Sequence, residues 1–250
     1  MNKKISFVVL TWNRSQMLER SLIELYSSIK NKEYCNIIIF DNASTDNTKE
    51  VISAFYNNYS SNIEIICHFS EVNLRLKAYK KLFKLASIAD IIVEFDDDVL
   101  AFPENVDEIF IQYLESFTKF GFLALNVIQN EHTNGAKPDI SHYKEVNIDK
   151  LVVEKGPTGG WCSGFRSNDF KKISWLFNLM PISMKSGEDG ALQNLFKLLG
   201  KGSGIIKEHK CFHAAGPYYS QQFNLLERDI EKYKAVGLDD FVNNYKNFKE

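Results

Sequence analysis

The sequence predicts a single α/β domain with a mostly parallel central sheet and a helical appendage at the C-terminus. Two observations predict this fold: short apolar runs alternate with helical patterns through the first hundred residues, and no repeat or low-complexity linker divides the chain. Strands that alternate with helices form βαβ units, whose helices cover both faces of a parallel sheet. We expect the domain to span 1–221, in two halves that meet near residue 100, and the appendage to span 222–250.

Apolar runs rich in β-branched and aromatic residues predict the strands of the first half. The expected strands are 5–11, 36–41, 63–69 and 90–96. Helices are expected between them, because apolar residues recur at helical spacing after Ser15, around Ile52 and over 76–87. Ser15 is expected to cap the first helix, since a serine hydroxyl can accept a hydrogen bond from the first turn.

The second half is less regular. The segments with clear patterns are a helix at 104–118, a strand at 121–128 and a helix at 168–178. Residues 129–150 are polar and predict a loop excursion or a hairpin, and 156–165 is dense in glycine. A further helix is expected to begin near Glu188 and to end at Gly200 or Gly202.

The composition fits an ordinary globular protein, with 44% of the 250 residues hydrophobic and 25% charged. The net charge of −2 leaves no overall basic excess, so nucleic acid is not expected as a partner. The four cysteines form no CxxC pair, and their spacing suggests neither a zinc site nor a disulfide framework. We therefore expect reduced, mostly buried thiols in a cytoplasmic protein.

The N-terminal apolar run superficially resembles a signal peptide. Asn13 and Arg14 interrupt this run, no small-residue cleavage site follows it, and no apolar run is long enough to cross a bilayer. A cytoplasmic protein is the expectation, and a peripheral position at the inner face of the cell membrane stays open.

Three consecutive aspartates, Asp96, Asp97 and Asp98, follow a strand. Like charges side by side repel, so we expect a positive charge among them. Neither GxGxxG nor GxxxxGK[ST] occurs in the chain, and a Mg²⁺ or Mn²⁺ ion held by carboxylates is the usual alternative for neutralising a diphosphate. In an extended segment Asp96 and Asp98 point one way and Asp97 the other. An acidic cap on helix 104–118 is the competing interpretation.

Polar residues also follow the first two strands. Thr11, Asn13 and Arg14 lie at the end of the first, and Asp41 ends the second. Ligands of parallel α/β sheets bind beyond the carboxyl ends of the strands, so these residues and the aspartates should converge on one pocket. Asp41 could accept a hydrogen bond from a base or a ribose, or it could form an Asx turn that opens the next helix.

Three further candidates lie in the second half. Glu188 and Asp189 open a predicted helix, where they could cap it, and Asp189 is equally a candidate general base for an acceptor hydroxyl. His213 could complete a metal site as a neutral imidazole, with His209 as its competitor. Trp161 could stack on a sugar ring or pack in the core.

Taken in order, the segments VVLTWNR, IIIFDNASTDNT, IIVEFDDDVL, GGWCSGF, GEDGALQ and HKCFHAAG resemble family 2 glycosyltransferases of the GT-A fold, and the chain looks like a bacterial member. The resemblance covers about residues 4–215. It implies a GT-A (nucleotide-diphospho-sugar transferase, Rossmann-like) domain with a nucleotide-binding half, 1–100, and an acceptor- and sugar-binding half, 101–221. Such enzymes transfer a sugar with inversion from a nucleotide donor, most often a uridine diphosphate sugar.

The resemblance also implies roles for individual residues. Those expected at the nucleotide-sugar donor are Thr11, Asn13, Arg14, Asp41, Arg75, Asp96, Asp97 and Trp161. Asp98 and His213 would bind a divalent cation, Mn²⁺ or Mg²⁺. Asp189 would be the catalytic base, with Glu188 beside it.

One segment departs from the family pattern. After the third strand such enzymes usually carry Asn-x-Gly, whereas Leu74 and Arg75 stand where glycine is expected. We expect a different backbone there, with Arg75 or Lys77 as a contact to the nucleotide or the diphosphate.

The leading interpretation is a metal-dependent, inverting hexosyl- or N-acetylhexosaminyltransferase acting on a glycan, lipid-linked or other glycosylated acceptor in cell-surface polysaccharide synthesis. One alternative is a nucleotidyltransferase that makes a nucleotide sugar, although the segment TWNRSQ lacks the basic glycine-rich loop that this chemistry usually uses. The other is a sugar-nucleotide-binding module without turnover, against which the presence of both Asp98 and Asp189 argues.

The tail from about residue 222 has the pattern of a charged amphipathic helix, with Leu225, Leu226, Ile230 and Tyr233 at helical spacing. Such a helix could bind a membrane surface. Its acidic and basic residues nearly balance, so packing on the domain or on a second subunit, as in a homodimer, is the favoured interpretation.

Overall fold

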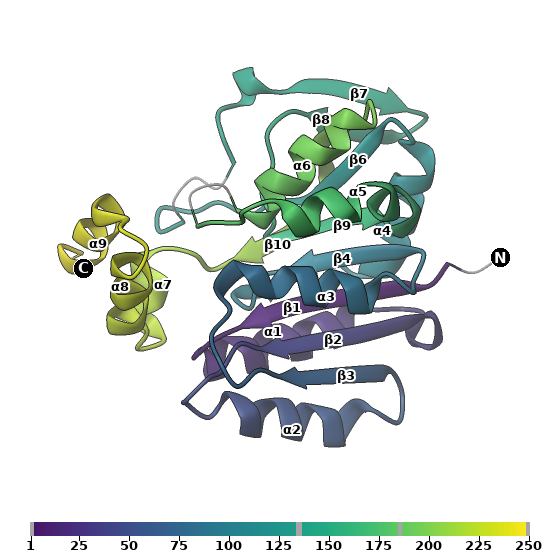
Figure 1. The fold of residues 1–250 in the computed structure, drawn as a ribbon. Coiled ribbons are helices and arrows are strands. Elements are labelled where there is room, and N and C mark those ends of the chain that lie inside the picture. Colours follow the sequence, from purple (N-terminus) through teal and green to yellow (C-terminus); the bar gives the residue numbers. More distant parts are fainter. Residues whose placement is uncertain (1–2, 134–136, 185–186, 249–250) are drawn as a thin grey trace.

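A mixed sheet runs through the centre of the molecule (Figure 1). The computed structural model describes residues 3–133, 137–184 and 187–248, and within these ranges the sheet has ten strands. The strands are β1 (Ile5–Thr11), β2 (Cys35–Asp41), β3 (Glu64–Phe69), β4 (Ile91–Phe95), β5 (Val99–Ala101), β6 (Phe120–Val127), β7 (Lys144–Ile148), β8 (Leu151–Lys155), β9 (Cys162–Arg166) and β10 (Gly202–His213). Their order is β3-β2-β1-β4-β9-β6-β10-β8-β7, and β5 pairs with β10 beside this path.

The N-terminal half of the sheet is parallel, as the alternating pattern predicts. β1 pairs with β2 and β4, and β2 pairs with β3. In the second half, β9 runs antiparallel between β4 and β6, and β7 and β8 form an antiparallel hairpin. A mostly parallel sheet is therefore correct for the first half, whereas the complete sheet is mixed, because the glycine-dense segment enters its middle in the opposite direction.

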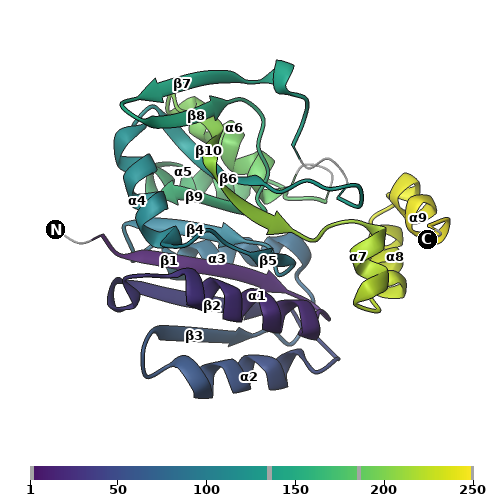
Figure 2. The same ribbon diagram turned by 180° about the vertical axis from the view of Figure 1, so that it is seen from behind.

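Helices cover both faces of the sheet (Figures 1 and 2). They are α1 (Ser15–Ser28), α2 (Thr48–Tyr59), α3 (Ala78–Ala86), α4 (Val106–Ser116), α5 (Ser167–Leu179), α6 (Glu188–Leu198), α7 (Pro217–Gln222), α8 (Leu226–Lys234) and α9 (Asp239–Lys246). α1, α2 and α4 pack on one face around Leu22 and Phe110, and α3, α5 and α6 pack on the other around Phe83 and Phe196. Two apolar cores therefore hold the sheet rigidly between them.

The strands and helices predicted up to residue 128, and the helix at 168–178, lie within about two residues of their expected bounds. The polar segment 129–150 leads into the β7–β8 hairpin, with Gly135 outside the described residues. β5 and β10 were not predicted, because β5 is short and β10 interrupts its apolar residues with glycines and charges.

Ser15 does not cap α1. It is the first helical residue, and its backbone N–H donates to a carboxylate oxygen of Asp46 at 3.1 Å. The other oxygen of Asp46 accepts from the Thr48 backbone N–H at the start of α2, also at 3.1 Å. One carboxylate thus serves the beginnings of two helices, a tertiary arrangement that no local serine pattern could reveal.

The four cysteines carry free thiols, and Cys35, Cys162 and Cys211 are buried, as predicted. Among the described residues, no helix combines the length and the apolar character that spanning a membrane requires.

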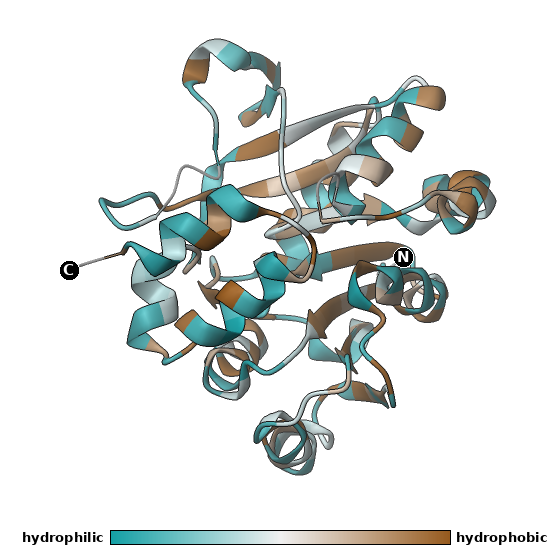
Figure 3. Ribbon diagram, turned by 60° about the vertical axis from the view of Figure 1, so that its left-hand side comes forward, coloured by the Kyte–Doolittle hydropathy of each residue, from teal (hydrophilic) through white to brown (hydrophobic). Residues whose placement is uncertain are grey.

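After β10 the chain forms three short helices, α7, α8 and α9, and the predicted tail, 222–250, holds α8 and α9 rather than one helix. The three helices follow β10 directly and lie beyond the carboxyl ends of β1 and β4 (Figure 1). Their residues are largely hydrophilic, in contrast to the apolar strands behind them (Figure 3). The tail is therefore placed at the edge of the sheet where ligands of α/β proteins bind.

Gly164 in β9 sets how closely α4 approaches the sheet. A Cβ at this position would lie 2.6 Å from Cδ1 of the fully buried Phe110. Gly164→Ala should lower the free energy of unfolding by about 1–3 kcal/mol, as overpacked cores do, and urea denaturation measures this. Gly190→Ala is the control, because no atom lies within 4 Å of its added Cβ and alanine favours helix. Equal stability of Gly164→Ala and the wild type would contradict the packing.

Candidate active site

A cavity of about 660 Å³ lies at the carboxyl ends of β1 and β4. This volume is in the range of small-molecule and cofactor sites. The predicted site residues that line the cavity are Thr11, Arg14, Arg75, Asp96, Asp97, Asp98, Glu188, Asp189 and His213. Residues separated by as much as 200 positions therefore converge, as the ends of neighbouring strands should.

Asp96, Asp98 and His213 meet at the wall of this cavity. Asp98 Oδ1 lies 3.0 Å from His213 Nε2, and Asp96 Oδ2 lies 3.4 Å from the same nitrogen. The three side chains offer ligand atoms that all lie within 4.8 Å of one another. Two carboxylates and one imidazole are donors that suit Mn²⁺ or Mg²⁺, so these residues fit a divalent cation.

His209, the competitor of His213, lies elsewhere on β10. Its ring packs edge-on against Tyr113 with the centroids 5.9 Å apart. Regular alternation would place residues four apart on the same face of the strand, but the pairing of β10 with β5 is irregular between Phe212 and His213, and His213 lies beside the aspartates.

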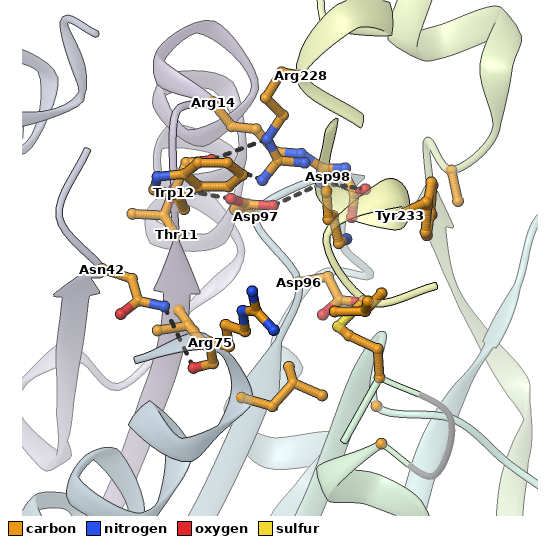
Figure 4. Close-up of a pocket in the computed structure, with 18 of the residues that line it drawn as sticks. Thr11, Trp12, Arg14, Asn42, Arg75, Asp96, Asp97, Asp98, Arg228 and Tyr233 are labelled. Atoms are coloured by element: carbon orange, nitrogen blue, oxygen red, sulfur yellow. Dashed lines mark hydrogen bonds and ion pairs between the residues drawn. The ribbon is translucent and has the colours of Figure 1, made fainter. Parts of the chain in front are cut away.

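Asp97 is not part of the cation cluster that Asp96, Asp98 and His213 form. The extended segment expected at the aspartates is wrong, because residues 97 and 98 lie in a turn that the Val99 N–H closes by donating to the Asp96 carbonyl at 3.1 Å. Asp97 accepts hydrogen bonds from Thr11 Oγ1 and from Arg14 Nη1, both at 2.8 Å. Arg14 Nη1 also donates to Asp98 Oδ2 at 2.5 Å, and Arg14 Nη2 lies 3.4 Å from Asp229 Oδ1 (Figure 4). The guanidinium of Arg14 is therefore one positive charge among the aspartates.

Neighbouring charges move the pKa values of the aspartates in opposite directions. Burial would raise the pKa of Asp98, but Arg14 and His213 hold it well below its usual value. The pKa of Asp96 rises to about 6, chiefly because the carboxyl is buried. Burial would lower the pKa of His213, but Asp98 and Asp96 raise it above the usual value. Asp98 therefore stays ionised at neutral pH, which is the form a metal ligand requires.

Three acidic side chains from β4 and α6 converge on Gly160. A Cβ on Gly160 would lie 3.2 Å from Glu94 Oε1, 3.3 Å from Glu188 Oε1 and 3.4 Å from Asp189 Cβ. Burial raises the pKa of Glu188 to about 8, and repulsion by Asp189 and Asp96 adds to it. Glu94 is buried, and neither of its carboxylate oxygens has a hydrogen-bond partner among the described residues. Sequence reasoning missed Glu94, because it lies inside an apolar strand.

Asp189 folds back over the residue that precedes α6. A Cβ on Gly187, which has φ of +64°, would lie only 2.0 Å from Asp189 Oδ1, so this position requires glycine. Burial raises the pKa of Asp189, although backbone N–H groups of Gly190 and Gly160 lower it. Burial therefore outweighs the lowering of the pKa that a helix N-terminus favours.

Asp41 and Asn13 are not among the residues that line the cavity. Asp41 Oδ1 accepts from the Ser44 backbone N–H at 3.1 Å, the turn that the sequence left open as an alternative. Its buried Oδ2 has no hydrogen-bond partner among the described residues. Asn13 Oδ1 accepts from the Thr45 backbone N–H at 2.7 Å. Both side chains therefore shape the loop beneath the site.

Trp161 packs in the core and does not present its ring to the cavity. Only 4% of the residue is exposed, and Nε1 donates to the Leu125 carbonyl at 2.8 Å. The expected stacking of Trp161 on a sugar ring is therefore wrong, and core packing is correct, because the ring is buried and its N–H is bonded to the sheet. The Trp161 carbonyl accepts from the Asp96 backbone N–H at 3.0 Å, so this residue helps to position the cation cluster.

Arg75 has φ of +51°, in the left-handed region that favours glycine. We expected a different backbone where glycine is missing, yet this residue keeps the conformation that glycine adopts readily. Hydrogen bonds hold it there: its N–H donates to Asn73 Oδ1 at 2.8 Å, and its carbonyl accepts from Asn42 Nδ2 at 3.3 Å. The side chain projects into the space between Asn42 and Asp96 (Figure 4). Lys77 lines a neighbouring hollow instead.

Residues of the tail complete the cavity. Arg228, Glu231, Lys232 and Tyr233 of α8 line it. Sequence reasoning missed these residues, because the tail has balanced charges and no motif. One indication in the sequence that the tail lies near the site is that it follows shortly after the last motif, which contains His213.

The sequence profile of glycosyl transferase family 2 matches residues 6–174. The chain belongs to this family. The matched segment runs from β1 to the middle of α5 and includes the aspartate run, so the resemblance found in the motifs is confirmed.

Individual relatives agree with the family assignment. Abequosyltransferase RfbV of Salmonella typhimurium is 47% identical over 74 residues, which cover 28% of this chain and 20% of that protein. The family 2 chain therefore spans only a small part of that relative.

Solved structures confirm the predicted GT-A fold. The mannosyltransferase PcManGT from Pyrobaculum calidifontis, in complex with GDP-Man and Mn²⁺, has a TM-score of 0.66 at 14% identity, covering 89% of this chain and 60% of that one. S. aureus TarS 1–349, in complex with UDP-GlcNAc, has a TM-score of 0.63 at 15% identity, covering 98% of this chain and 72% of that one.

Glu188→Gln should stabilise this family 2 protein at alkaline pH. The folded pKa of about 8 lies above the usual 4.5, so the contribution of Glu188 to stability is fully present below about pH 4.5 and is lost as the pH rises through about 8. We expect the variant to gain about 1–3 kcal/mol in the free energy of unfolding above pH 8, and nothing below pH 4.5, in urea denaturation.

Glu19→Gln is the matched control, because Glu19 is exposed on α1. A gain in Glu188→Gln that is independent of pH, or equal to that of the control, would contradict a buried carboxyl at Glu188.

Proposed function

We propose that this chain is a metal-dependent, inverting glycosyltransferase of the hexosyl- or N-acetylhexosaminyl type. It moves a sugar from a nucleotide-diphosphate donor, with a uridine diphosphate sugar expected first, to a hydroxyl of a glycan, lipid-linked or other glycosylated acceptor in cell-surface polysaccharide synthesis. The observation that carries the proposal is that the Asp96–Asp98–His213 cluster and Asp189 line one cavity. A cation site and a candidate base at one cavity are what such a transfer requires.

Asp96, Asp98 and His213 would hold the divalent cation. When bound, such an ion offsets the negative charge that develops on a departing diphosphate. Arg14 donates to Asp98 Oδ2 and so keeps this carboxylate ionised, while Oδ1 faces His213. Arg14 therefore bonds one oxygen of Asp98 and leaves Oδ1 available to a cation.

Asp189 would accept the proton of the acceptor hydroxyl. The acceptor oxygen forms a bond to the anomeric carbon as the bond from this carbon to the diphosphate oxygen breaks, and the proton moves to the Asp189 carboxylate. The raised pKa of Asp189 supports this role, because a base works best when its pKa is close to the working pH. One displacement by an acceptor opposite the leaving group inverts the configuration of the anomeric carbon.

We propose a separate task for each half of the chain. Residues 1–100 would bind the nucleotide, with Thr11 and Arg75 lining its end of the cavity, and 101–221 would bind the sugar and the acceptor. PcManGT is in complex with GDP-Man and Mn²⁺, and TarS is in complex with UDP-GlcNAc, so proteins of this fold bind different nucleotide sugars. With a lipid-linked acceptor the reaction would take place at the inner face of the cell membrane.

The metal site predicts metal-dependent nucleotide binding. Calorimetric titration of UDP, GDP, dTDP and CDP should show binding of one of them that requires Mn²⁺. Asp98→Asn should weaken this binding at least about ten-fold, because it removes one ligand of the cluster.

Asp97→Asn is the matched control, because Asp97 also contacts Arg14 but is not one of the three residues of the cluster. It should keep the Mn²⁺ dependence. Nucleotide binding that depends neither on Mn²⁺ nor on Asp98 would contradict the proposed metal site. If none of the four nucleotides binds, the proposed donor site is wrong.

Asp189→Asn should separate binding from turnover. The variant keeps the shape of the side chain and loses its basicity, so the affinity for the nucleoside diphosphate should stay within about two-fold while transfer falls at least about 100-fold. Release of the nucleoside diphosphate from the matching donor sugar measures the rate. Asp240→Asn, on the exposed face of α9, is the control, and full activity of Asp189→Asn would exclude it as the base.

A further inference from the structure

The tail is joined to the aspartate run through one buried carboxylate. Asp229 of α8 is completely buried and accepts from Ser220 Oγ at 2.5 Å and from Arg228 Nη1. Arg14 Nη2 approaches Asp229 at 3.4 Å, and Nη1 of the same guanidinium bonds the aspartate run. The position of α8 is therefore tied to the position of the cation cluster.

A second contact fixes how α8 is turned. Arg228 donates from Nη2 and Nε to the Trp12 carbonyl, at 2.7 and 3.2 Å, and its guanidinium lies 5.0 Å from the centre of the Trp12 ring. Lys232 follows Arg228 by four residues, so both side chains lie on the same face of the helix. Both residues line the cavity, and Figure 4 shows Arg228 beside Trp12.

Lys232 is a partly buried cation without a bonded anion. No described carboxylate lies within ion-pair distance of its Nζ, and its nearest described ring partner is Tyr233, with Nζ 5.3 Å from the ring centre. Burial, together with the guanidinium groups of Arg14 and Arg228, lowers the pKa of Lys232. An anionic ligand would relieve this crowding of positive charge.

Arg75 lines the same cavity from the loop after β3, and its guanidinium likewise pairs with no described carboxylate. Lys232 and all three residues of the cation cluster line this one cavity. An anion bound to the cation cluster would therefore lie within the electrostatic reach of Lys232. In a donor sugar, the group that combines this charge with metal binding is the diphosphate.

We propose that α8 forms part of the donor site and that Lys232 binds the phosphate oxygens of the donor diphosphate, with Arg75 on the other wall. This assignment rests on the proposed function, since it names a residue of the same donor site. It gives the tail a task in ligand binding, in addition to its packing on the domain.

The test compares Lys232→Gln with Lys234→Gln, which removes an equal charge from the exposed side of the same helix. With Mn²⁺ present, whichever of UDP, GDP, dTDP or CDP binds the wild type should bind Lys232→Gln about ten-fold more weakly, and Lys234→Gln within about two-fold of the wild type. The corresponding nucleoside, which lacks phosphate, should bind Lys232→Gln and the wild type equally, and Lys232→Arg should restore most of the diphosphate affinity.

Unchanged diphosphate affinity in Lys232→Gln would overturn the assignment and leave the donor site standing. An equal loss in Lys234→Gln, or an equal loss of nucleoside affinity, would overturn it too, because neither points to a phosphate contact. If none of the four nucleotides binds the wild type, the proposed function fails, and the role of Lys232 fails with it.

Discussion

The site depends on one buried guanidinium. Arg14 lies among Asp97, Asp98 and Asp229, which come from the loop after β4 and from α8. A buried charge without a partner costs several kcal/mol, so none of these groups is stable in its place without the others. The interaction simultaneously orients a ligand of the cation cluster, holds Thr11 through Asp97, and attaches the tail. The same guanidinium therefore positions Asp98 and connects α8 to the domain.

The acidic side chains around Gly160 have no ion-pair partner among the described residues. Glu94, Glu188 and Asp189 crowd around this glycine. Such crowding destabilises the free protein, because burial penalises every ionised carboxylate. A site that binds and transforms a ligand commonly holds this kind of strain, which the rest of the fold supports. Here two apolar cores on opposite faces of the sheet provide the support.

The sequence allowed the first half of the fold and the cation cluster to be predicted, since both follow from local rules. The run of aspartates marks the end of β4, and the parallel pairing of β1 with β4 brings Thr11 beside it. Tertiary contacts were beyond such rules. The turn formed by Asp41 and the packing of Trp161 stayed open until their partners were visible.

Long-range contacts of single charged residues were the least predictable part. Arg14 and Asp229 are separated by 215 positions, and an acidic residue in an amphipathic helix gives no indication of such a partner. Glu94 reads as an exception within an apolar strand, although its neighbours in space belong to α6. In both cases the partners of a buried charged residue depend on the topology of the fold, which the local sequence pattern does not contain.

The position of α8 in the chain also bears on protein synthesis. Domains fold from the N-terminus as the chain leaves the ribosome. A nascent chain that has folded as far as His213 already has the cation cluster, but its Arg14 still lacks Asp229. The cavity gains its last wall only after α8 has emerged, so a ribosome-bound intermediate would have an open, unfinished site. The proposed donor site would therefore be complete only once the chain beyond β10 has left the ribosome.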